Sequence, residues 1–195
     1  KVLHSRCVEI AKKYGVELLV CSSLNRNSGT MVREKTKMEK MLISGVAADK
    51  NVAKIRVAGL GNDPESTFRL LNLLDRNNLN IDVMIQSLGK DGTKSVSFTV
   101  AKPDMLRTID VLNDNKDLLG IKKLDYDENV AKISVIGAGV RSHSGVAAKM
   151  FGALANAGIN TEMVTTSEIR ITALIDEAYA DQAMRAIHET FLERV

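Results

Sequence analysis

The sequence contains no tryptophan, and phenylalanine and tyrosine bring the aromatic content to only 4%. A protein that binds single-stranded nucleic acid needs aromatic side chains on which bases stack, so this scarcity argues against that class. Lysine and arginine number 27 against 24 aspartates and glutamates, and the net charge of +3 is too balanced for a protein that follows a nucleic-acid backbone. We therefore expect no nucleic-acid partner.

Long apolar segments and paired cysteines are also missing. The longest apolar run, residues 15–21, is interrupted by Glu17, whereas a membrane span needs about 20 consecutive apolar residues. Cys7 and Cys21 are the only cysteines, and their spacing fits neither a disulfide framework nor a zinc site. These absences predict a reduced cytoplasmic protein with no membrane contact and no metal.

Groups that perform chemistry are few. There are three histidines, neither cysteine has an evident base partner, and no GxxxxGK[ST] phosphate loop is present. The segment 137–139 (GAG) matches a dinucleotide-binding motif only partly, because Ser142 stands at the third glycine position. The two strands predicted after it follow each other directly and leave no room for a crossover helix. We therefore predict no catalytic residues and no cofactor in this chain.

The chain contains an internal repeat. Residues 51–61 (NVAKIRVAGLG) and 129–139 (NVAKISVIGAG) are identical at eight of eleven positions, at an offset of 78. A second block, residues 79–82, aligns with residues 159–162 at an offset of 80. Two blocks that agree in the same order indicate a duplicated structural unit.

Hydrophobic periodicity predicts the order strand, helix, strand, strand, helix, strand for the first copy. The second copy follows this order but ends before a fourth strand. A spare strand, Met41–Ala47, stands just before the first copy. We infer that it completes the second sheet, which makes the first copy an insertion within the second. Alternatively, it pairs elsewhere and the second unit has three strands.

The N-terminal residues follow a different pattern. A helix is predicted from Leu3 to Tyr14 with Gly15 as its C-terminal stop, followed by a strand over 16–21 and a loop over 22–30. Residues 33–40 carry six charges in eight positions and predict a solvated linker or an exposed helix.

Several segments together resemble the regulatory half of aspartate kinase. They are ISGVAADKNVAKIRVAGL, NLNIDVMIQS, VIGAGVRSHSGVAAKMF, TSEIRITALI and RAIHETF, which lie within residues 42–194. Residues 1–31 resemble the C-terminal edge of the kinase domain of the same enzyme. The resemblance implies an α+β fold of two ferredoxin-like βαββαβ ACT units, the first inserted in the second.

The resemblance also divides the chain. It implies a kinase-domain edge over 1–31, a linker over 32–41, a second ACT unit made of 42–50 plus 128–195, and a first ACT unit over 51–127. The nucleotide-binding and aspartate-binding segments of the kinase are absent from this sequence, so we predict that the chain alone is non-catalytic.

The implied function is regulatory. The parent enzyme phosphorylates L-aspartate with ATP and Mg, and lysine and/or threonine inhibits it by binding to the ACT pair. The expected partners are such an amino-acid effector, a second copy of the chain in a homodimer through ACT units, and possibly a kinase-bearing large subunit. The alternative is a free-standing ACT-type amino-acid-binding or dimerisation module without a kinase partner.

The resemblance assigns effector-binding residues by motif. A helix N-terminus offers free N–H groups to the effector carboxylate, and the second strand and hairpin of one unit are expected to face the helix start of the other. Relatives carry Asp-x-Pro-Gly at the first helix start, whereas Asn62 and Glu65 stand at the Asp and Gly positions here. The predicted effector-binding residues are Asn62, Glu65, Thr67, Gln86, Asn160, Thr161, Thr166, Ser167 and Glu168.

Overall fold

The computed structural model describes residues 3–24, 29–32, 43–142 and 145–192. The chain forms two compact parts, an N-terminal part (Lys1–Lys40) and a C-terminal part (Met41–Val195). The linker predicted over 32–41 lies outside the described residues except for Val32, as do the first two residues of the predicted spare strand.

The described residues of the N-terminal part form one helix and a two-stranded antiparallel sheet. Helix α1 (Ser5–Tyr14) ends at Gly15, whose φ of 64° is the left-handed conformation predicted for the stop residue. Strand β1 (Leu18–Val20) pairs with β2 (Thr30–Val32), a strand that the composition of the preceding loop did not predict. Large apolar side chains in this part are exposed, Tyr14 at 70% and Leu24 at 94%.

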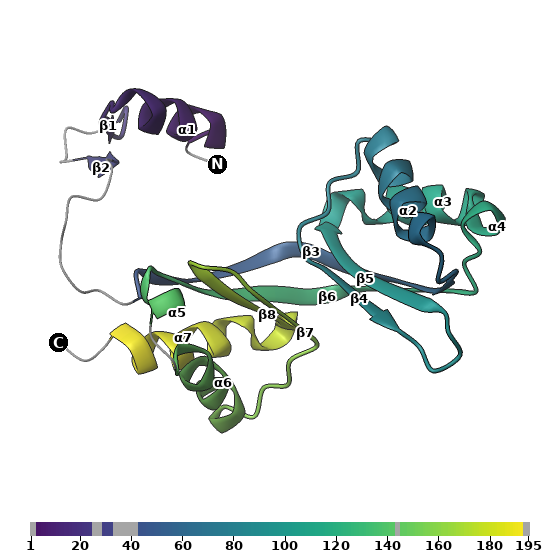
Figure 1. The fold of residues 1–195 in the computed structure, drawn as a ribbon. Coiled ribbons are helices and arrows are strands. Elements are labelled where there is room, and N and C mark those ends of the chain that lie inside the picture. The colour runs from purple at the N-terminus through teal and green to yellow at the C-terminus, as the bar shows by residue number, and fades with distance from the viewer. Residues whose placement is uncertain (1–2, 25–28, 33–42, 143–144, 193–195) are drawn as a thin grey trace. The chain divides into compact units, whose positions relative to one another are not determined.

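The C-terminal part is built on one six-stranded antiparallel sheet with the order β4-β5-β3-β6-β8-β7 (Figure 1). Its strands are β3 (Gly45–Leu60), β4 (Met84–Leu88), β5 (Lys94–Ala101), β6 (Lys123–Ile136), β7 (Met163–Thr166) and β8 (Arg170–Asp176). The two central strands are the longest, and both repeats contribute to them.

The pairing of β3 with β6 confirms the inserted arrangement. The beginning of β3 pairs with the end of β6 (Gly45↔Ile136), and the end of β3 pairs with the beginning of β6 (Ala58↔Lys123). The spare strand therefore completes the sheet of the second unit, and the three-stranded alternative is wrong. Sequence periodicity predicted separate strands, whereas β3 and β6 each run without a break through both units.

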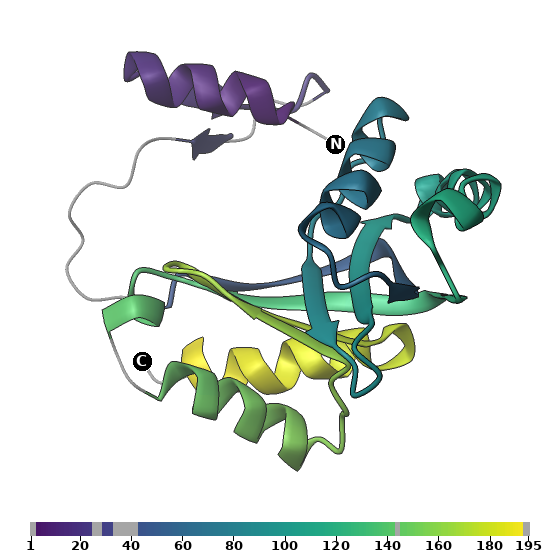
Figure 2. The ribbon, with the colours of Figure 1, turned by 45° about the vertical axis from the view of Figure 1, so that its right-hand side comes forward.

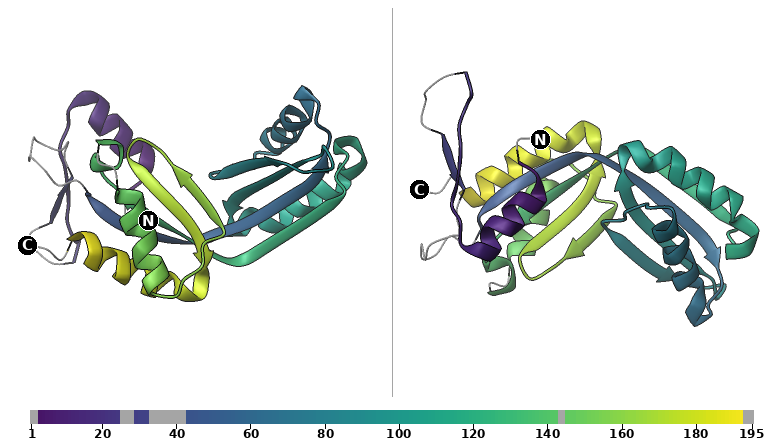
Figure 3. Two further views of the ribbon diagram at one scale, coloured as in Figure 1. Left: turned by 60° about the horizontal axis from the view of Figure 1, so that its bottom comes forward. Right: turned by 90° about the horizontal axis from the view of Figure 1, so that it is seen from above.

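Helices cover each half of the sheet. The first unit carries α2 (Pro64–Arg76), the short η1 (Lys102–Asp104), α3 (Met105–Asp114) and α4 (Lys116–Leu119). The second unit carries α5 (Gly139–Ser142), α6 (Val146–Asn156), η2 (Glu177–Tyr179) and α7 (Ala180–Leu192). Figures 2 and 3 show α6 and α7 side by side against the second half, and α2 to α4 against the first. The single-turn helices α4 and α5 were not predicted.

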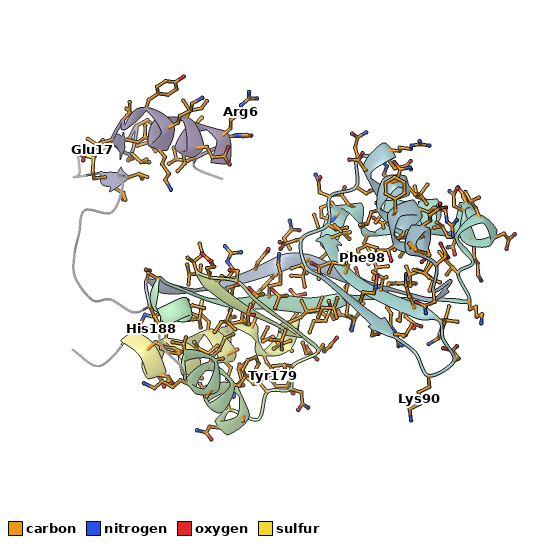
Figure 4. All side chains as sticks on the ribbon, in the orientation of Figure 1. Arg6, Glu17, Lys90, Phe98, Tyr179 and His188 are labelled. Carbon is orange, nitrogen blue, oxygen red and sulfur yellow. The ribbon has the colours of Figure 1, made fainter. Side chains whose placement is uncertain are left out.

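Each unit has its own apolar core. Phe98, in β5, is buried between the first half of the sheet and its helices (Figure 4). Met150 and Ile187 bring α6 and α7 onto Ile133 of β6 in the second core. A third, smaller cluster lies where the two units meet, and its buried members are Val52, Val83, Val130, Met163 and Leu174. Among the described residues, no helix is long and apolar enough to cross a bilayer.

Candidate functional site

The helix start of the first unit is occupied by the protein's own charged groups. Pro64 begins α2, and the Asp63 carboxylate accepts a hydrogen bond from the Glu65 backbone N–H at 3.0 Å. Arg69 contacts Asp63 at 3.2 Å and Glu65 at 3.4 Å. A ligand carboxylate would therefore compete with Asp63 for the N–H groups at this helix start.

Two further candidates of the first unit touch each other. The Thr67 hydroxyl donates to the Gln86 side-chain carbonyl at 2.7 Å and links α2 to the edge strand β4. Gln86 is exposed and Thr67 is half-buried. The structure thus brings the four candidates of the first unit to the start of α2 and the adjacent part of β4.

The candidates of the second unit fall into two places. Asn160 and Thr161 line a pocket of about 440 Å³ whose other walls are mainly apolar, including Phe151 and Leu154. Thr166, Ser167 and Glu168 are exposed where β7 turns into β8. Because β7 lies between them, the two groups are at opposite ends of that strand.

A larger groove runs along the side of the second unit that its helices do not cover. The Ser134 and Thr172 side chains, 2.9 Å apart and only 8% and 5% exposed, lie at positions that alternate with the core residues of β6 and β8. The groove measures about 480 Å³, and Lys132, Arg170 and Asp82 contribute charged groups to it. Of the predicted effector residues, only Ser167 lines it. Sequence reasoning missed this groove, although polar residues alternate with apolar ones over 132–135.

The first unit has a smaller groove of about 310 Å³ beside the β4–β5 hairpin. Asp91 lines it and accepts hydrogen bonds from the backbone N–H and the hydroxyl of Thr93, at 3.1 and 2.9 Å. These bonds, led by the backbone one, hold the pKa of Asp91 below its ordinary value. Lys90, next to it, projects from the tip of the hairpin (Figure 4).

The helix start of one unit and the hairpin of the other lie far apart within one chain. Through the register of the sheet, Gln86 lies in the row of Val57, and Thr166 lies in the row of Val46. These rows are separated by eleven residue steps along β3, which corresponds to about 36 Å at 3.3 Å per residue. The expected facing of hairpin and helix start is therefore not formed between the two units of a single chain.

The helix start of the second unit differs chemically from that of the first. Helix α6 follows Gly145, whose φ is 101°, and no described side chain caps it. Its first turn contains no acidic residue. The N–H groups of this turn are therefore not engaged by a carboxylate of the described chain, as those of α2 are.

Comparison with known proteins gives a consistent picture. Residues 133–191 match the ACT domain family. The chain is 38% identical over 194 residues to the aspartokinase of Pseudomonas aeruginosa, an alignment that covers 98% of this chain and 47% of that protein. The chain thus spans about half the length of the curated relatives it matches.

Two solved structures match this chain over almost the whole of their own length. The structure of aspartokinase alpha and beta subunits is 41% identical, with a TM-score of 0.72, and the match covers 76% of this chain and 98% of that one. The ligand-free regulatory subunit of aspartate kinase from Thermus thermophilus is 32% identical, also with a TM-score of 0.72, over 77% of this chain and 99% of that one.

Proposed function

Because the chain belongs to the aspartokinase family, as a regulatory region made of two ACT units, we propose that it binds an end-product amino acid. Binding lowers the activity of a kinase domain that phosphorylates L-aspartate. The observation that carries this proposal is the start of α6, which no side chain of the described residues caps and which follows central strand β6 after the short helix α5. The backbone N–H groups of a helix start and the helix dipole favour a ligand carboxylate there.

The proposed effector is lysine and/or threonine. Lysine brings a second ammonium group, which needs a carboxylate. Asp82 and Glu162 are poor partners because each already bonds to a lysine of the protein. Glu65 is the better candidate, since its side chain is 76% exposed and its contact with Arg69 is long at 3.4 Å. A threonine hydroxyl would instead use short polar side chains such as Thr166 and Ser167.

The proposed assembly is a homodimer. Since the β7–β8 hairpin of the second unit and the α2 start of the first lie far apart along the sheet, a two-fold axis between two copies would bring the hairpin of each copy to the α2 start of the other. Such an interface uses the same surface on both copies and closes upon itself.

A kinase partner completes the proposal. One matched structure is an aspartokinase with alpha and beta subunits, and residues 3–24 expose apolar side chains, including Ile10, Tyr14 and Leu19, that fit the edge of a larger domain. ATP and Mg would bind to the kinase domain, so this chain holds no cofactor. With its two unpaired thiols, the chain is proposed to work in the cytoplasm.

Thermal unfolding tests the proposal directly. The chain is heated with L-lysine, L-threonine, both together, and L-alanine as the control ligand. A ligand at about 100 times its dissociation constant stabilises by ~2.7 kcal/mol, which raises the melting temperature by roughly 5–10 °C for a chain of this size. A rise with one amino acid identifies the effector, and a rise that needs both indicates concerted feedback.

Matched variants locate the site. Ser167→Ala, in the hairpin whose Ile169 carbonyl accepts the Gly137 N–H ahead of α6, is expected to reduce the shift. Asn156→Ala, an exposed residue at the far end of α6, is expected to leave it unchanged. No shift with lysine or threonine would overturn effector binding by this chain. The free-standing dimerisation module would then be the better description if the chain still dimerises.

A further inference from the structure

The two units are joined by ion pairs that the repeat makes equivalent. Lys54 and Lys132 occupy the same position in the two copies, at the offset of 78, and Asp82 and Glu162 correspond at the offset of 80. Lys54 forms an ion pair with Glu162, and Lys132 forms one with Asp82 and a second, at 3.2 Å, with Asp49 of its own unit. Each lysine therefore bonds to the carboxylate of the opposite unit.

Each lysine also has an equivalent carboxylate in its own unit, and it is not used. Lys54 pairs across the sheet with Thr99, whose carbonyl accepts the Asp82 backbone N–H at 3.1 Å. Lys132 pairs with Leu174, whose carbonyl accepts the Glu162 backbone N–H at 2.8 Å. The backbone rows are the same in both units, but the pairs Lys54–Glu162 and Lys132–Asp82 cross from one unit to the other.

The sheet changes register at this junction. The β3–β6 pairing shifts between Asp49 and Val52 and again between Val52 and Lys54. On each strand an aspartate carboxylate accepts the N–H two residues on, Asp49 from Asn51 and Asp127 from Asn129, both at 2.9 Å. Bulges of this kind increase the local twist of a sheet. The two units therefore meet at a twisted point where side chains of both reach across.

Other contacts follow the same two-fold pattern. Lys102 and Glu177, the first residues of η1 and η2, form an ion pair at 3.0 Å. The third apolar cluster lies at the same junction and includes Val52 and its repeat equivalent Val130. The lysine side chains there are shielded, Lys54 being 24% and Lys132 14% exposed, so their ion pairs are screened less by salt than surface pairs are.

We propose that the crossed pairs Lys54–Glu162 and Lys132–Asp82 couple the two units, so that a change of stability in one unit is passed to the other. Glu162 directly follows the effector candidates Asn160 and Thr161, and its partner Lys54 lies on the central strand of the first unit. This coupling deepens the proposed function, because it gives a ligand in the second unit a route to the first. Lys54 and Lys132 are positioning residues in this scheme.

Hydrogen exchange measures the coupling without any ligand. Ile187→Val removes one methylene from the buried core of the second unit, and such changes cost about 0.5–1.5 kcal/mol. In the otherwise unchanged chain, exchange is expected to rise about two- to tenfold both in β8 of the second unit and in β5 of the first. In the Lys54→Met/Lys132→Met background, the rise is expected in β8 alone.

Two controls keep the result specific. Lys50→Met removes an exposed lysine whose partner, Asp181, lies in the same unit. In this background, Ile187→Val should raise exchange in β5 as much as it does in the unchanged chain. Lys54→Glu/Glu162→Lys exchanges the charges of one pair and keeps their attraction. In this background, Ile187→Val should raise exchange in β5 as in the unchanged chain. If the double methionine variant does not fold, Lys54→Met alone, which breaks the pair with Glu162 and keeps that of Lys132 with Asp82, takes its place and is expected to show a smaller rise in β5 than the unchanged chain.

The coupling is overturned if the rise in β5 persists in the double methionine background, or if the unchanged chain shows no rise in β5. Because no effector is added, neither outcome bears on whether the chain binds an amino acid. Conversely, a chain that binds no amino acid could still show the coupling.

Discussion

At the residue scale, the two helix starts that follow the central strands are chemically unlike. The start of α2 has Asp63 as its cap, while the start of α6 has Gly145 and no described capping side chain. A carboxylate at a helix N-terminus satisfies N–H groups that have no partner within the helix. The first unit supplies this carboxylate itself, whereas no carboxylate of the described residues does so in the second.

The cap of α2 predicts a difference between neighbouring residues. Asp63→Ala should lower the free energy of unfolding by about 1 kcal/mol, because it removes the bond to the Glu65 N–H. Asn62→Ala, the control next to it, should leave stability unchanged. Urea denaturation with an unchanged m-value measures both, and equal midpoints for the two variants would contradict the role of Asp63.

The side-chain partners of single residues at the site could be predicted only in part from the sequence. Family motifs placed Thr67 and Gln86 in one pocket, and these two side chains do touch. The same motifs could not show that Asp82 and Glu162, considered as partners for a lysine effector, bond to lysines of the opposite unit. Those bonds depend on how two distant strands twist past each other, which local sequence does not encode.

At the scale of elements, the most informative features are the two strands shared by both units. The repeat and the spare strand predicted the inserted order of the sheet, since a βαββαβ unit that lacks its last strand must obtain one elsewhere. The bulges and the continuity of β3 and β6 were not predicted, because periodicity within one segment contains no information about register against another. The short helices α4 and α5 are single turns and too brief to show a period.

Two glycines of these elements predict effects of opposite sign. Gly59 has a φ of 90° at the register shift near the end of β3, and a Cβ there would meet the Lys122 side chain. Gly59→Ala should therefore destabilise the protein by about 1 kcal/mol or more.

Gly152 is the matched case, within α6 and with open space around it. Gly152→Ala should stabilise by about 0.5–1 kcal/mol, because alanine favours the helix. Melting temperatures of both variants provide the measurement. A stabilising effect of Gly59→Ala would show that β3 can adopt another backbone at this point.

At the scale of the whole molecule, the C-terminal part is built around apolar cores, whereas the large apolar side chains described in the N-terminal part are mostly exposed. The C-terminal part has two complete cores. The N-terminal part exposes several large apolar side chains for its small size. Exposed apolar surface of this kind marks a region that contacts another domain or promotes association.

This contrast predicts the behaviour of a shortened chain. Residues 41–195 alone should melt at the same temperature as the full chain, since both cores lie within them. They should also associate less in sedimentation velocity at high concentration. The full chain carrying Tyr14→Ser and Leu19→Ser should lose association to a similar extent. A large fall in the melting temperature on truncation would contradict the independence of the C-terminal part.

The pairing of Val52 with Val130 has a consequence for how such a protein changes over time. The inserted unit enters and leaves its host at neighbouring positions on two antiparallel strands, whose Cα atoms are about 5 Å apart. A segment whose two ends meet so closely can be exchanged for another without lengthening any connection. The first unit could therefore be exchanged as a whole in the course of evolution, while the second unit keeps its own sheet and helices.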